Sequence, residues 1–185
     1  MKENKLTIYF IIKLAVFSIL GILVLIFKNT FVEHLKYFIG GLLLLYGVEE
    51  IGFEIATHRK KSYLKEKVYL GFVELILGVV LLAASLSFEV VCVIWATWAI
   101  IRESYELKEV AAELEHLVPR AISGIESVVV IAFSVELMIV QDAHAAGVHM
   151  YLLVVELVCT PLVPLLEEIL LERKQKKNEQ NQQDC

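Results

Sequence analysis

Ionisable side chains recur at regular places in otherwise apolar stretches of the sequence. Three single residues, Lys13, Glu74 and Glu126, each lie about six positions inside such a stretch. Three further stretches end in an ionisable pair: Glu49-Glu50, Arg102-Glu103 and Glu167-Glu168. These nine residues comprise seven acids and two bases, so five carboxyl groups have no cation within the set. Such groups either keep a proton or bind a cation, and we expect proton and cation occupancy to be linked.

The deepest of these residues are predicted to carry the chemistry. Glu74 and Glu126 are flanked by aliphatic residues and are the candidates for titration or cation binding. Lys13 and Arg102 are the candidate counter-charges, Lys13 because it occupies the equivalent position in its own stretch. The residues expected to line an inner mouth are Glu50, Glu103 and Glu168. A structural polar cluster without ion handling is the alternative.

The paired residues have a second interpretation. A charge at the centre of a bilayer costs about 2.5–3.5 kcal/mol on insertion scales, and less towards the interface. In this interpretation the three pairs lie among the lipid headgroups, in contact with water, and only determine how deep each helix sits in the bilayer. In that case Arg102 and Glu106, at positions i and i+4, form a simple surface pair.

Two more carboxylates, Glu136 and Glu156, are expected at similar depth towards the other side of the bilayer. If they approach each other, one of them keeps a proton, because two close carboxylates in an apolar site do not both ionise. Together with Glu89 and the inner residues they mark a hypothetical proton path. The alternative is that each forms a structural hydrogen bond to a neighbour.

Two prolines, Pro161 and Pro164, precede the last acidic pair. They remove backbone donors from a helix and predict a kink there, which serves either as a gate or as a packing bend.

The segment 141–150 is predicted to be an outer loop with Asp142, His144 and His149. Its composition suits a pH sensor or a metal entry point, and a plain solvated loop is the alternative. No metal site or cofactor is predicted. The three cysteines are an odd number and predict no disulfide framework.

These residues must be positioned by membrane-spanning helices. Hydrophobic residues make up 58% of the chain, against roughly 45–50% in soluble proteins. A span needs about 20 apolar residues. The windows that meet this length are 8–27, 37–56, 68–85, 88–107, 121–140 and 148–171. They predict an all-α bundle of six transmembrane helices. Trp95 and Trp98 lie inside the fourth window and are expected to face neighbouring helices.

The basic residues predict the orientation. Of the 17 Lys and Arg residues, 14 fall on one side, together with both termini, which places the termini in the cytoplasm of a multi-pass cell-membrane protein. The windows group into three related hairpins over 8–56, 68–107 and 121–171. The membrane domain is then 1–173, and 174–185 is a polar disordered tail. The segment from Lys108 is expected to extend the fourth helix until Pro119 stops it.

Several function classes are disfavoured. A net charge of −5 argues against nucleic-acid binding. Phosphate-binding, dinucleotide-binding, zinc-protease and nucleophile-elbow motifs are not found, so no enzyme is predicted.

The hairpin layout and the run Gly40-Gly41-Leu42-Leu43-Leu44-Leu45-Tyr46-Gly47 resemble the HdeD-like family of small bacterial membrane proteins. The resemblance implies six spans and a link to acid resistance and stress response. The leading hypothesis is a protein that handles protons or small cations through its buried glutamates, alone or as a homo-oligomer. The alternative is a non-transporting scaffold or accessory subunit whose intramembrane charges pair with a partner membrane protein.

Overall fold

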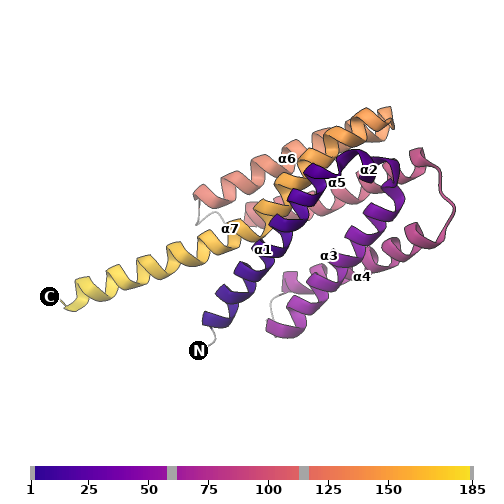
Figure 1. Cartoon of the computed structure of the whole chain (residues 1–185). Coiled ribbons are helices and arrows are strands. Elements are labelled where there is room, and N and C mark those ends of the chain that lie inside the picture. The colour runs from indigo at the N-terminus through magenta and orange to yellow at the C-terminus, as the bar shows by residue number, and fades with distance from the viewer. Residues whose placement is uncertain (1–2, 58–61, 113–116, 184–185) are drawn as a thin grey trace. The chain divides into compact units, whose positions relative to one another are not determined.

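The computed structural model describes residues 3–57, 62–112 and 117–183 of the chain. Within these residues every regular element is an α-helix and none is a strand, which confirms the predicted all-α class. The helices are α1 (Glu3–Ile26), α2 (Lys28–Glu33), α3 (Leu35–Thr57), α4 (Ser62–Ala83), α5 (Phe88–Ala112), α6 (Leu117–Val140) and α7 (Ala143–Gln183) (Figure 1).

Each predicted apolar window falls on one long helix. The agreement follows from local chemistry, because a continuous apolar run has no turn-forming residues to interrupt it. The short helix α2 was not predicted and occupies the expected connection between the first two windows. Single turn residues, Phe27 and His34, separate it from α1 and α3.

Two helices are longer than their windows. Helix α5 extends past Leu107 to Ala112, as the sequence predicted. Residues 113–116 lie outside the described residues, and Pro119 is in the first turn of α6, where a missing N–H removes no helical hydrogen bond. Helix α7 continues to Gln183, so most of the predicted disordered tail is helical. The reason is that Lys, Gln and Glu favour helix and the tail contains no Pro or Gly.

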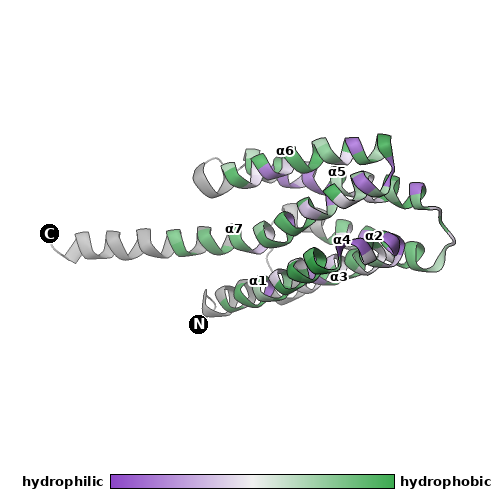
Figure 2. Cartoon of the chain, turned by 45° about the horizontal axis from the view of Figure 1, so that its top comes forward, coloured by the Kyte–Doolittle hydropathy of each residue, from purple (hydrophilic) through white to green (hydrophobic). Residues whose placement is uncertain are grey.

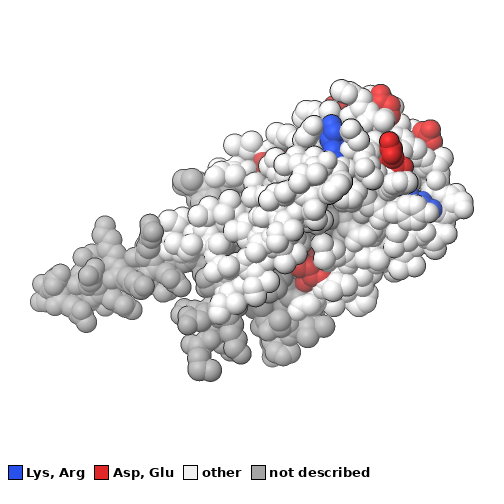
Figure 3. Space-filling view, viewed as in Figure 1, with Lys and Arg blue, Asp and Glu red and all other residues white. Residues whose placement is uncertain are grey.

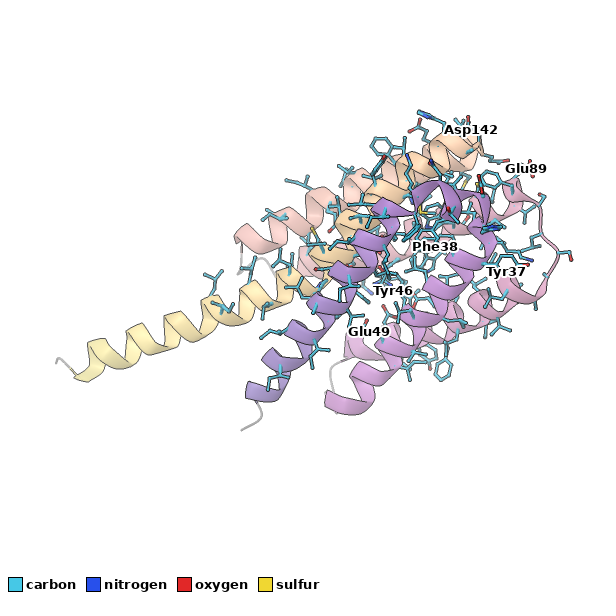
Figure 4. The ribbon with its side chains drawn as sticks, viewed as in Figure 1. Tyr37, Phe38, Tyr46, Glu49, Glu89 and Asp142 are labelled. Atoms are coloured by element: carbon cyan, nitrogen blue, oxygen red, sulfur yellow. The ribbon has the colours of Figure 1, made fainter. Side chains whose placement is uncertain are left out.

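Helices α6 and α7 are joined by Gln141 and Asp142 alone. Gln141 has a left-handed backbone (φ 50°), and its Nε2 donates to the carbonyl oxygen of Met138 at 2.6 Å. Asp142 Oδ1 accepts from the backbone N–H of Ala145 at 2.7 Å and caps α7 (Figure 4). The predicted loop over 141–150 is therefore wrong from Ala143 onward, because an Asp cap is sufficient to begin the helix there.

The chain divides into two compact units. The first comprises Met1–Lys28, Glu103–Phe133 and Gly147–Cys185, and the second comprises Asn29–Arg102 and Ser134–Ala146. Buried apolar side chains of the first unit include Phe17, Val24, Val130, Leu153 and Leu157. Those of the second include Ile39, Leu43, Tyr46, Leu81 and Trp95.

Large aliphatic side chains are also exposed along the helices. Ile19 on α1, Ile76 on α4 and Ile139 on α6 are 60%, 64% and 76% exposed. The described helix bodies are largely hydrophobic (Figure 2), and few charged atoms appear on the face drawn in Figure 3. Two apolar stretches of the described residues are long enough to cross a membrane, Ala121–Val140 and Ala143–Val163. Two shorter apolar stretches are Ile11–Ile26 and Val68–Ala83.

Candidate functional site

Helices α3 and α4 lie side by side in the second unit and pack through glycines (Figure 1). Gly47 meets Gly71 and Gly40 meets Gly78, so the two helices run antiparallel. A Cβ added at Gly47 would lie 2.6 Å from the carbonyl oxygen of Gly71, and one added at Gly78 would lie 2.9 Å from that of Gly40. In each helix the two glycines are seven residues apart and therefore share one face. Small residues at such contacts let membrane helices approach closely.

This close packing positions Glu74, which lies between the two contact glycines of α4. Its side chain is completely buried, at 0% exposure. Arg102 of α5 donates from Nη1 to Glu74 Oε1 at 3.0 Å, an ion pair that is also a hydrogen bond. Because Arg102 is only 3% exposed, the interpretation that it forms a solvated surface pair with Glu106 is wrong. Each charge offsets part of the hydration that the other loses on burial.

Two aromatic side chains complete the surroundings of this ion pair. Trp98 lies one turn before Arg102 on α5, and its Nε1 donates to the same Glu74 Oε1 at 3.0 Å. The ring of Tyr46 on α3 has its centroid 3.9 Å from the Arg102 guanidinium carbon, a cation–π contact. The Tyr46 and Trp98 ring centroids are 5.6 Å apart. The expectation that Trp98 faces neighbouring helices is confirmed by these contacts.

A second carboxylate reaches the same guanidinium from α3. Glu50 Oε1 lies 3.5 Å from Arg102 Nη1, and the Glu50 side chain is 10% exposed. Glu49 precedes it, one turn after Tyr46 on α3 (Figure 4), and its charge also acts on Glu74. We call Arg102, Glu74 and Glu50 the Arg102 cluster. It contains one cation and two carboxylates.

Four other residues predicted to handle ions belong to the first unit. Glu103 and Glu156 are buried there, whereas Lys13 and Glu126 are half-buried. The burial of Glu103 argues against a solvated interfacial position for the Arg102-Glu103 pair. The role predicted for Lys13 as a counter-charge is filled at Glu74 by Arg102.

The predicted outer pair is divided between the units. Glu156 is buried in the first unit, and Glu136 is exposed in the second. Their mutual approach stays a prediction. Glu89 is exposed in the first turn of α5 (Figure 4).

The predicted gate lies in an unbroken helix. Pro161 is buried, and the backbone of α7 remains helical through both Pro161 and Pro164. The side chains of Pro164, Glu167 and Glu168 lie outside the described residues.

Among the described side chains of the predicted inner mouth, Glu50 is joined to Glu74 through Arg102.

The two histidines of the predicted outer loop have different environments. His144 is exposed in the first turn of α7, whereas His149 is 3% exposed. A plain solvated loop is therefore the wrong description for His149. In the part of the chain that the structure describes, no group of three or more His, Cys, Asp or Glu residues is arranged to hold a metal ion.

Sequence reasoning missed three parts of this site. The four contact glycines share a seven-residue spacing in two successive windows, and this repeat was the available signal. The four-residue spacing of Trp98 and Arg102 places both on one helix face, a signal that was not used, and it does not identify the carboxylate that both contact. Nothing in the sequence singled out Tyr46 as the residue that covers the guanidinium.

The chain has no significant match among protein family models, curated proteins or solved structures. The resemblance to the HdeD-like family stays a prediction, and the chain is assigned to no known family.

Proposed function

We propose that the protein is a multi-pass membrane protein that handles protons or small cations at the Arg102 cluster. The observation that carries this proposal is Glu74. It is completely buried in an apolar helix, and its Oε2 has no hydrogen-bond partner among the described residues. Ionisable residues inside membrane helices are rare and mark ion or proton pathways.

Membrane insertion is supported by what the helices expose. Only 22% of the Ala121–Val140 stretch is buried, whereas a core helix of a soluble protein is mostly buried. Helices α3, α4 and α5 have 23, 22 and 25 residues. At 1.5 Å per residue each is long enough for a hydrocarbon core of about 30 Å. Our proposal is six spans, one for each long helix, in three hairpins with both termini in the cytoplasm.

The cluster argues against the scaffold hypothesis at this position. A scaffold would leave an intramembrane charge for a partner protein to neutralise. Arg102 already contacts two carboxylates, Glu74 and Glu50, within one unit of one chain. A role in acid resistance or stress response rests on the family resemblance alone.

Ion flux through liposomes tests the proposed function. The full-length protein is purified, reconstituted and assayed for proton, Na⁺ and K⁺ flux beside the Glu74→Gln variant. Glu33→Gln is the matched control, because Glu33 is an exposed residue of α2 in the same unit. We expect flux of at least one ion in the natural protein and in Glu33→Gln, and its loss in Glu74→Gln. Folded protein that conducts none of these ions would overturn ion transport and favour the scaffold.

A further inference from the structure

We propose that the ion held at the Arg102 cluster is a proton, carried on Oε2 of Glu74, and not a metal cation. This inference rests on the proposed function, because it names the ion for the same site. It follows from three features: the hydrogen bonds of the Glu74 carboxyl group, the charge balance of the cluster, and the type of polar group around it.

The two oxygens of the Glu74 carboxyl group have different surroundings. Oε1 accepts two hydrogen bonds, from Trp98 Nε1 and Arg102 Nη1, each at 3.0 Å. Oε2 is buried and has no hydrogen-bond partner in the described part of the chain. This asymmetry matches a neutral carboxylic acid, in which one oxygen is a carbonyl acceptor and the other bears the hydrogen. An ionised carboxylate would leave half of its charge on a buried oxygen without a donor.

Among the described contacts, two carboxylates of the cluster share one guanidinium. Among the described residues, Arg102 of α5 contacts Glu74, Glu50 of α3 contacts the same Arg102 Nη1, and Glu49 of α3 is close enough for its charge to act on Glu74. Arg102 supplies the single positive charge of the cluster, against the two carboxylates of Glu74 and Glu50. A proton on Glu74 makes the cluster neutral, because Arg102 is then balanced by Glu50, 3.5 Å away. Neutrality is strongly favoured away from water.

The polar groups that α5 brings to Glu74 do not suit a metal cation. Trp98 and Arg102 offer N–H donors and no lone pairs, and the guanidinium repels a second cation. Hard cations such as Ca²⁺ and Mg²⁺ require about six oxygen ligands, whereas a proton requires one. The carboxylate oxygens of Glu74 and Glu50 are fewer than such a cation needs, and no group of three or more His, Cys, Asp or Glu among the described residues could hold a metal ion, whereas Glu74 Oε2 alone can carry a proton.

In this proposal, Glu50 is the residue that exchanges the proton with Glu74. It is the more accessible carboxylate, with 10% of its side chain exposed against 0% for Glu74, and both contact Arg102 Nη1. On loading, the O–H bond of protonated Glu50 breaks and an O–H bond forms at Glu74 Oε2. Glu50 becomes a carboxylate as Glu74 becomes neutral, so Arg102 keeps one ionised partner before and after transfer.

Infrared spectroscopy tests the proton directly and without transport. The carbonyl stretch of a protonated carboxyl group is recorded for the full-length protein in lipid at neutral pH. We expect this band in the natural protein and in Glu33→Gln, and its loss in Glu74→Gln. Trp98→Phe removes one donor to the carbonyl oxygen, so the band should persist and move to higher frequency. This second variant tests the assignment even if Glu74→Gln does not fold.

The infrared result and the flux result are interpreted independently of each other. The inference is overturned if no band is present, if the band is insensitive to both Glu74→Gln and Trp98→Phe, or if Na⁺, K⁺ or Mg²⁺ abolishes it by displacing the proton. A band with these properties in a protein without flux supports the proton site and contradicts transport. Flux that requires Glu74 without such a band supports transport and overturns the proton assignment.

Discussion

Arg102 Nη1 and Glu74 Oε1 lie 3.0 Å apart, and neither residue is more than 3% exposed. The two residues are 28 positions apart in sequence and come from α5 and α4. Their pairing depends on the glycine contacts that hold α4 against α3, and on Tyr46 and Trp98, which fix the guanidinium and the carboxylate.

Removing Arg102 alone should destabilise the protein strongly. Arg102→Met removes the cation that balances Glu50 and a hydrogen-bond donor to Glu74 Oε1, and breaking a buried charge pair in this way costs about 3–5 kcal/mol. The double variant Arg102→Met/Glu50→Gln should recover a large part of this loss, because it also removes the carboxylate that Arg102 balances. Unfolding in detergent is measured for the natural protein, both single variants and the double variant. Strictly additive losses in the double variant would show that the two side chains do not interact.

Gly47 should not tolerate even a methyl group. Its added Cβ would lie 2.6 Å from the backbone carbonyl oxygen of Gly71, so α3 and α4 must move apart in Gly47→Ala. We expect a loss of about 1–3 kcal/mol, typical of overpacking. Gly41→Ala is the matched control on the same helix, because nothing lies within 4 Å of its added Cβ. Thermal unfolding compares the two variants, and equal melting temperatures would contradict the close helix contact.

The cap of α7 should depend on the Asp142 side-chain oxygen. Asp142→Ala removes the acceptor of the Ala145 N–H, and loss of such a cap costs about 0.5–2 kcal/mol. Asp142→Asn keeps an oxygen at this position and should retain most of the stability. Thermal unfolding in detergent separates the two outcomes. If Asp142→Asn were as unstable as Asp142→Ala, the contribution would come from the charge and not from the cap.

The proposed topology is tested by cysteine accessibility in cells. Ser87 lies in the connection between α4 and α5, and Lys108 lies near the end of α5; both are exposed. In a Cys185→Ser background, a membrane-impermeant thiol reagent should label Ser87→Cys in intact cells and Lys108→Cys only after the membrane is opened. The positive-inside rule gives this direction. Labelling of both positions in intact cells, or the reverse pattern, would contradict the proposed orientation.

The sequence alone determined where the helices are. Six apolar windows match six long helices, because span length and hydrophobicity are local properties of the chain. It also marked Glu74 as a candidate buried group, because an ionisable residue in an apolar stretch is expected to face the protein interior. The start of α7 was predicted too late, because Asp142 was treated as a possible metal ligand and not as a helix cap.

Only the tertiary structure decided which charges meet. Sequence position made both Lys13 and Arg102 candidates for the counter-charge of Glu74, and nothing local distinguishes them. Which cation pairs with Glu74 depends on how closely α3 and α4 pack at their glycines and on which face of α5 lies against them. These are properties of helix packing, set by contacts between residues distant in sequence. The same packing directs two N–H donors to Oε1 of Glu74 and none of the described donors to Oε2.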